Sequence, residues 1–268
     1  MMDLLRYDFG YDWPWTYGHA LAGAVFVLAA WAAWRARALW WSAGLVALAV
    51  WAFASAIVVN AVMGFSVPIP LPTDRFLPSG DVRVLDAGAG SGRSTLMVLL
   101  ARPRARVTAL DIFATNYGIS DNTESRLRAN ARAAGAEDRL DVATGDMREM
   151  PFGAASFDGA VSAFAIDHLN RADRQRTYAE MRRVIRPGGE FLLLVINNDR
   201  WIRTVFPFLA QHGYFGPQTA AERWRTELED AGFELIDDGA VPGTLYYLAR
   251  TSGPTMASAT AAPVGTGR

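Results

Sequence analysis

The stretch Val82-Arg-Val-Leu-Asp-Ala-Gly-Ala-Gly-Ser-Gly92 decides the fold of this chain of 268 residues. Its apolar start predicts a buried strand, which ends at Asp86 and leads into a loop with glycine at every second position. The apolar run 94–100 predicts a helix directly after the loop, and a second apolar run, 107–110, stops at another carboxylate, Asp111. A strand, a glycine turn, a helix, a strand and an acid together form half of a nucleotide-type site.

The glycine loop departs from two familiar phosphate-binding patterns. The dinucleotide fingerprint needs Gly or Ala at position 93, where this chain has Arg93. A P-loop needs lysine, and all 26 basic residues of the chain are arginine. The remaining pattern is Asp-x-Gly-x-Gly-x-Gly, with Ser91 placed to cap the following helix. Asp111, at the end of the second strand, can accept both hydroxyls of a ribose.

Composition excludes several classes of protein. A net charge of −1 without a basic block argues against a general nucleic-acid binder, which needs basic residues to neutralise phosphates. Cysteine is absent, which excludes disulfides, thiolate metal sites and cysteine nucleophiles. Three scattered histidines are too few to suggest zinc, so we expect no metal.

Two apolar segments, about 15–34 and 38–65, precede the glycine stretch. Neither contains an acid or a base, and each reaches the ~20 residues that cross a bilayer. Only a short connection with Arg35 and Arg37 separates them, and tryptophans lie at their ends, as is typical of membrane interfaces. We therefore expect a two-helix transmembrane hairpin. The alternatives are a buried soluble hairpin and a cleaved signal peptide, although the first residues lack the positive charge of a signal peptide.

The rest of the chain divides by composition. Residues 66–80 are rich in proline and predict a stiff linker, 81–250 form one α/β domain, and 251–268 predict a disordered tail. Further strands are expected at 140–146, 159–164, 190–196, 233–237 and 244–249. Further helices are expected at 124–134, 171–185, 200–212 and 219–231.

The glycine motif and Asp111 resemble motif I and the following acidic strand end of class I S-adenosylmethionine-dependent methyltransferases. Three further blocks fit the same family, above all its ubiquinone/menaquinone-biosynthesis-like small-molecule branch: Gly145-Asp146-Met147, Met150-Pro-Phe-x-x-x-Ser-Phe-Asp158 and Glu180-x-x-Arg-Val-Ile-Arg-Pro-Gly-Gly189. The resemblance covers about residues 82–197. It implies a Rossmann-like, seven-stranded, mostly parallel sheet with one antiparallel strand and helices on both faces.

The resemblance also implies an S-adenosylmethionine site. Its cofactor-binding residues would be Asp86, Gly88, Gly90, Gly92, Asp111, Ile112, Asp146 and Met147. The glycines would form the turn under the methionine part, and Asp86 would hold its amino group directly or through water. Asp111 would hold the ribose, Ile112 would pack on the adenine, and Asp146 with the backbone of Met147 would bind the adenine edge.

Chemistry in this class is an in-line displacement at a sulfonium methyl, so the protein mainly aligns the acceptor and excludes water. A base is needed only for an acceptor that arrives protonated. Asp167 and His168 follow the fourth strand, at the edge where α/β ligands bind, and His168 could act as base or orienter. The alternative for His168 is a cap or packing histidine. Tyr117, Asn197 and Trp201 could line the acceptor site, although the loop holding Tyr117 could equally be ordinary surface.

The resulting hypothesis is a membrane-tethered methyltransferase that acts on a small hydrophobic or lipid-borne acceptor and binds no nucleic acid. Alternatives are an aminopropyl-transfer enzyme on the same fold and a non-catalytic membrane scaffold. Two crossings leave the domain on the side of the N-terminus. The cytosolic cofactor places the domain in the cytoplasm, whereas the positive-inside rule would place Arg35 and Arg37 there. A re-entrant hairpin would resolve this conflict.

Overall fold

The computed structural model describes residues 6–114, 119–197, 200–206 and 220–252. Seven strands form one sheet in the order β3-β2-β1-β4-β5-β7-β6, and β7 runs antiparallel to both of its neighbours. The strands are β1 (Arg83–Ala87), β2 (Arg106–Asp111), β3 (Leu140–Thr144), β4 (Phe157–Ala163), β5 (Ile185–Ile196), β6 (Phe233–Val241) and β7 (Thr244–Thr251). The predicted mostly parallel sheet with one antiparallel strand is confirmed.

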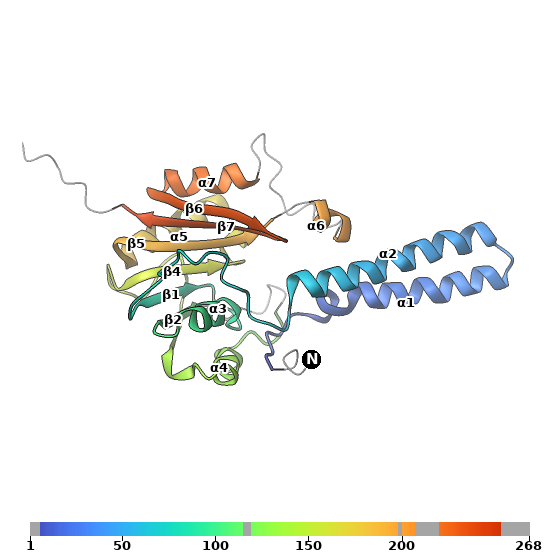
Figure 1. Cartoon of the computed structure of the whole chain (residues 1–268), viewed down its shortest axis with the longest axis horizontal. Coiled ribbons are helices and arrows are strands. Elements are labelled where there is room, and N and C mark those ends of the chain that lie inside the picture. Colours follow the sequence, from blue (N-terminus) through green and yellow to red (C-terminus); the bar gives the residue numbers. More distant parts are fainter. Residues whose placement is uncertain (1–5, 115–118, 198–199, 207–219, 253–268) are drawn as a thin grey trace, which may run out of the picture.

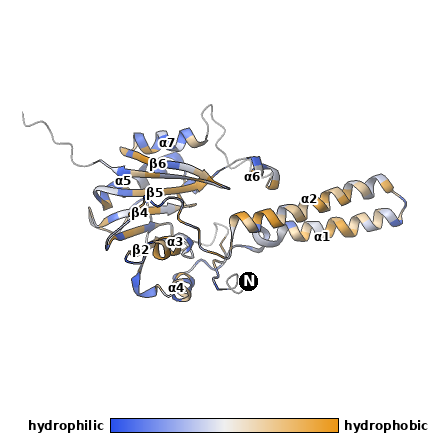
Figure 2. Cartoon of the chain, in the orientation of Figure 1, coloured by the Kyte–Doolittle hydropathy of each residue, from blue (hydrophilic) through white to orange (hydrophobic). Residues whose placement is uncertain are grey.

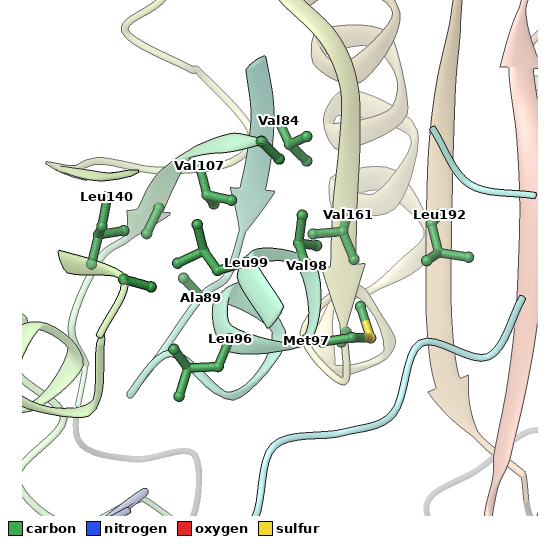
Figure 3. Packing of buried hydrophobic residues seen from close by; sticks show 14 of the residues in the cluster. Val84, Ala89, Leu96, Met97, Val98, Leu99, Val107, Leu140, Val161 and Leu192 are labelled. Carbon is green, nitrogen blue, oxygen red and sulfur yellow. The ribbon is translucent and has the colours of Figure 1, made fainter. Parts of the chain in front are cut away.

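Helices cover both faces of the sheet (Figure 1). They are α3 (Arg93–Ala101), α4 (Glu124–Ala133), α5 (Arg171–Val184) and α7 (Ala220–Asp230). Successive strand residues point to opposite faces, so Val84 belongs to the core under α3 and Leu85 to the core under α5 and α7. Figure 3 shows the first core, in which Leu96, Val98 and Leu99 of α3 pack on the sheet.

An antiparallel helical hairpin projects from this domain (Figure 1). Its helices are α1 (Trp13–Arg35) and α2 (Leu39–Met63), and both are apolar along most of their length (Figure 2). The buried residues between them are mostly small: Gly23, Ala30, Ala49, Ala52, Ser55 and Val59. Both helices are long and apolar enough to cross a membrane, and their most apolar windows are only 17% and 22% buried. Such exposure is unlike the core helix of a soluble protein.

The proline-rich segment 66–80 contains no helix or strand. It is nevertheless packed on the domain. Phe76 and Leu77 are buried in the core, and the Arg102 Nε donates to both of their carbonyls at 2.9 Å. The segment therefore holds the chain after α2 against the sheet along a fixed path.

The prediction that Ser91 caps the helix after the glycine loop is wrong. Gly92, with φ +92°, is the residue that precedes α3, and no side chain caps this helix. The Ser91 hydroxyl instead donates to the carbonyl of Phe9 at 2.7 Å. Glycine takes the cap position because this left-handed conformation is strained for other residues.

Candidate functional site

Parallel register brings three of the predicted cofactor segments to one edge of the sheet. Gly88 N donates to Leu110 O at 2.8 Å, and Gly145 N donates to Asp111 O at 3.0 Å. These bonds extend the β1–β2 and β2–β3 ladders beyond the ends of the strands. The glycine turn (residues 88–92), Asp111 and Asp146 therefore lie together at the carboxyl edge of the sheet, where ligands of open α/β sheets bind.

The glycine turn fits tightly between its neighbours. Gly88 and Gly90 have φ values of +79° and +53°. A Cβ at Gly88 would overlap the Cβ of Ala165 and lie 2.8 Å from the Met147 Cε. A Cβ at Gly90 would lie 3.3 Å from the Ile119 Cδ1. Gly88 is half-buried and Gly90 is buried, so this left-handed turn has room only for residues without a side chain.

Asp111 is fixed so that it faces this turn. Its Oδ2 accepts from Gly90 N at 2.7 Å, and its Oδ1 accepts from Phe113 N at 2.6 Å. Asn122 also donates to Oδ1 at 3.4 Å. A carboxylate has about four acceptor sites, and three of them are used here, so Oδ2 can still accept a ribose hydroxyl. The neighbouring Ile112 is 48% exposed, which leaves apolar surface beside the acid.

Asp146 and Met147 follow β3. The Asp146 carboxylate accepts from Arg148 Nη2 at 2.6 Å and from Arg148 Nε at 2.9 Å, and these hydrogen bonds hold its pKa below its usual value. Asp146 is therefore ionised at neutral pH and can only accept hydrogen bonds. A contact between Asp146 and the adenine amino group stays a prediction.

Asp86 is fully buried. Its carboxylate accepts from Ser94 Oγ at 2.8 Å and from Thr95 Oγ1 at 2.6 Å. Burial raises the pKa of Asp86 to about 6, and the two hydroxyls partly oppose this rise. Asp86 thus fastens β1 to the first turn of α3 and supports the glycine turn from below. A contact with the cofactor amino group stays a prediction.

The predicted catalytic pair lies in a short 3-10 turn, Ile166–His168, directly after β4. Asp167 is half-buried and His168 is exposed. Burial raises the pKa of Asp167, while the charge of His168 and a backbone hydrogen bond from Ile196 oppose the rise. The contact with Ile196 places the pair beside the end of β5, so it shares the carboxyl edge with the cofactor segments. Its catalytic role stays a prediction.

The predicted acceptor residues are only partly described. Asn197 follows β5 and is half-buried, with its N–H donating to Gly243 O at 2.9 Å. Trp201 lies in α6 (Arg200–Val205), but its side chain is outside the described residues, as is the whole of Tyr117. Their roles stay predictions. No group of three His, Asp or Glu residues in the described part of the chain could hold a metal.

Two of the family blocks have a structural role. Glu180 Oε2 accepts from Met150 N at 2.7 Å, and Arg183 donates to the carbonyls of Met150 and Phe152 at 3.0 and 2.6 Å. The block around Met150 and the block around Glu180 thus lock each other. Asp158 accepts from Arg83 N at 2.6 Å and pairs with Arg186 at 2.7 Å, which joins the starts of β1, β4 and β5.

Sequence reasoning missed several residues around the glycine turn. Asn122 and Ile119 contact Asp111 and Gly90 from the segment before α4, and neither stood in a recognisable motif. Tyr11, from the segment before α1, bridges to Ile119. Arg93 was noted only as a departure from the dinucleotide pattern, yet its side chain reaches the end of α2. Such contacts join distant parts of the sequence and leave no local signal.

Comparison with known proteins gives the site a context. Residues 84–189 match the sequence model of a methyltransferase domain. The chain is 36% identical over 122 residues to 24-methylenesterol C-methyltransferase 2 of Oryza sativa subsp. japonica, a match covering 46% of this chain and 30% of that protein. It is 32% identical over 151 residues to a ubiquinone/menaquinone biosynthesis C-methyltransferase of Paracoccus denitrificans, covering 52% of this chain and 56% of that protein. The chain thus spans between about a third and just over half of these relatives.

Solved structures share the fold. An O-methyltransferase family 2 protein from Planctomyces limnophilus, in complex with apigenin, superposes with a TM-score of 0.53 at 18% identity, covering 75% of this chain and 61% of that protein. The [4+2]-cyclase SpnF superposes with a TM-score of 0.51 at 19% identity, covering 67% of this chain and 78% of that protein. At these identities the likeness concerns the fold alone.

Proposed function

Since the chain belongs to the class I S-adenosylmethionine-dependent methyltransferase family, we propose that it transfers a methyl group from S-adenosylmethionine to a small hydrophobic or lipid-borne acceptor. The observation that supports cofactor binding best is the pairing of Asp111 with Gly90 N at 2.7 Å at the carboxyl edge. This bond supports a ribose site because it holds the carboxylate of Asp111 against the glycine turn, between the ends of β1 and β3.

Each residue at this edge would bind a different part of the cofactor. The glycine turn would carry the methionine part, Asp111 the ribose hydroxyls and Ile112 one face of the adenine. Asp146 would accept from the adenine amino group, and the Met147 N–H would donate to the ring. When bound, the cofactor supplies an activated methyl group on a sulfonium. The protein then has to align the acceptor behind that group and exclude water.

A base would come from the turn after β4. His168 is exposed at the carboxyl edge, next to the half-buried Asp167, and could remove a proton from an acceptor that arrives as a phenol or an ammonium. Asn197, Tyr117 and Trp201 would then line the acceptor. An acceptor that arrives deprotonated would need only positioning, because the leaving group is already activated.

The hairpin supports the hydrophobic character of the acceptor. Its two exposed apolar helices would hold the enzyme at the bilayer and raise the local concentration of a lipid-borne substrate. The names of two relatives refer to a sterol and to ubiquinone and menaquinone biosynthesis, which are hydrophobic compounds. We further propose a two-pass anchor with the catalytic domain on the cytoplasmic side, where the cofactor is made.

The test is binding and transfer by the full chain in detergent or vesicles. Calorimetry should show S-adenosylhomocysteine binding, and tritiated methyl groups should enter lipids extracted from membranes. Asp111→Ala removes the ribose acceptor and two backbone contacts, so we expect at least about a tenfold loss of affinity. Asp141→Ala, an exposed acid on β3, is the matched control. Equal binding and labelling by both variants, or preferential consumption of decarboxylated cofactor, would overturn the proposal.

A further inference from the structure

Arg93 connects the glycine turn to the end of the second hairpin helix. It is the first residue of α3, and its Nη2 donates to the carbonyls of Met63 and Gly64, the latter at 2.9 Å. Its Nε donates to the carbonyl of Val67 at 3.0 Å. One guanidinium thus binds three carbonyls, those of residues 63, 64 and 67, around the point where α2 stops.

The chemistry of a helix end explains why arginine suits this position. The last carbonyls of a helix have no partners within the helix and carry partial negative charge. Gly64 ends α2 in the left-handed conformation, with φ +53°, and its carbonyl accepts from Val67 N as well as from Arg93 Nη2. The Arg93 guanidinium has five donors in a planar fork and also lies 5.6 Å from the ring centre of Tyr11. It therefore neutralises and fixes the helix end.

The chain entering the hairpin is held at the same turn. The Ser91 hydroxyl donates to the carbonyl of Phe9, which is 1% exposed, at 2.7 Å. Ser120 N donates to Gly10 O at 2.7 Å, so the segment before α1 also pairs with the segment beside Gly90. Ser91 and Arg93 are the neighbours of Gly92. Both ends of the hairpin are therefore fastened to the cofactor turn.

A third attachment lies on the acceptor side of the site. His19 Nε2 of α1 donates to the carbonyl of Val205 in α6 at 2.8 Å. An apolar cluster formed by Val59, Phe65, Val205 and Phe206 joins α6 to the base of the hairpin. Because α6 follows β5, the hairpin is held at the carboxyl edge from both the cofactor side and the acceptor side (Figure 1).

From these contacts we propose that Arg93 is a positioning residue that sets the orientation of the carboxyl edge toward the bilayer. The proposal rests on the membrane-tethered function given above. It deepens that function, because a hairpin fastened at three points presents the site at one height and tilt. The acceptor class is then a membrane-resident molecule whose reactive group lies at the depth of the lipid headgroups. A flexible tether would not impose such a depth.

The orientation can be measured without knowing the acceptor. The chain has no cysteine, so one introduced cysteine carries a unique donor dye. Glu149→Cys labels the carboxyl edge, and Ala154→Cys labels the opposite edge before β4; both positions are exposed. Energy transfer to dye-labelled headgroups is then recorded in vesicles of phosphatidylcholine and phosphatidylglycerol. We expect more transfer from position 149 than from position 154, and Arg93→Met should reduce this difference by about half or more.

Activity gives an independent readout. Arg93→Met should lower methyl transfer into vesicle lipids about tenfold, because the reacting groups lose their alignment. Its affinity for S-adenosylhomocysteine should stay within about threefold of the wild type, since Arg93 donates to the hairpin and not to the cofactor residues. Arg93→Lys keeps one charge without the fork and should fall between the two. Arg102→Met is the matched control, because Arg102 binds linker carbonyls from the other end of α3.

The outcomes separate this inference from the proposed function. Protein that does not float with vesicles would overturn both the membrane tether and the role of Arg93. Protein that floats, binds S-adenosylhomocysteine and keeps the same energy-transfer difference in Arg93→Met would overturn only the inference. So would an equal loss of cofactor affinity and lipid methylation in Arg93→Met and Arg93→Lys, which would make Arg93 a residue that shapes the glycine turn.

Discussion

Replacing Asp86 by Asn should stabilise the protein, and the stabilisation should be larger at alkaline pH than at acidic pH. The Asp86 carboxyl is 0% exposed, and burial raises its pKa from 3.8 to about 6. A raised pKa in the folded state means that folding is most favourable when the group is protonated. The favourable contribution of the protonated Asp86 carboxyl to folding is fully present below pH 3.8 and is lost as the pH rises to about 6.

The size of the effect follows from the shift. About two pKa units correspond to about 3 kcal/mol, which the ionised carboxylate costs the fold at pH 8. At pH 5 the cost is about 1.6 kcal/mol, so about 1.4 kcal/mol separates the two conditions. Asparagine cannot ionise, and its amide can still exchange hydrogen bonds with the Ser94 and Thr95 hydroxyls, which rotate freely enough to donate or accept.

The assay is thermal unfolding of the full chain in detergent, followed by circular dichroism at pH 5 and pH 8. We expect the advantage of Asp86→Asn over the wild type to be larger at pH 8 by about 3 to 6 °C. Asp141→Asn, on the exposed side of β3, controls for the loss of one acid. The reasoning would be refuted if the difference between Asp86→Asn and the wild type were the same at both pH values.

Two further predictions concern stability. Gly88→Ala should lower the free energy of unfolding by about 3 kcal/mol, because its Cβ would overlap Ala165 in a backbone with φ +79°. Gly135→Ala, with φ +69° and open space around it, is the control and should lower it by about 1 kcal/mol. Equal shifts in melting temperature for the two variants would contradict the packing of the turn. Glu227→Gln should lower the free energy of unfolding by about 3 kcal/mol, because it removes the negative charge that pairs with Arg174 at 2.7 Å. The Arg174 side chain is only 4% exposed. Burial opposes ionisation of Glu227, but Arg174 and Arg223 hold its pKa below its usual value, so this contribution is lost as the pH falls. Glu124→Gln, in an exposed pair with Arg128, should change stability by less than about 0.5 kcal/mol in the same unfolding assay.

Much of the fold could be predicted because its signals are local. The apolar runs ending at Asp86 and Asp111 became β1 and β2, and the long apolar segments became α1 and α2 within three residues of the expected limits. Strand alternation and segment length depend only on neighbouring residues. The segments that meet at the carboxyl edge could be predicted as well, because glycine at alternate positions and an acid at a strand end have few other uses together.

What each acid does depended on the tertiary structure. Asp86 and Asp111 look alike in the sequence, since both end a strand. Burial and two hydroxyls from α3 give Asp86 a supporting role, whereas backbone N–H groups hold Asp111 toward the glycine turn. Likewise, the family block around Glu180 proved to lock the loop at Met150 through a side-chain hydrogen bond.

The sequence by itself determined a mostly parallel α/β domain, a glycine turn and an apolar hairpin, because periodicity, glycine and hydrophobicity act over short stretches of chain. Only the tertiary structure decided how these parts are joined. The bonds from Ser91 to Phe9 and from Arg93 to Gly64 connect residues far apart in the chain, and no local pattern encodes such pairs. These bonds form because the close-packed fold brings backbone carbonyls and side-chain donors together at the carboxyl edge, where they can form hydrogen bonds with each other.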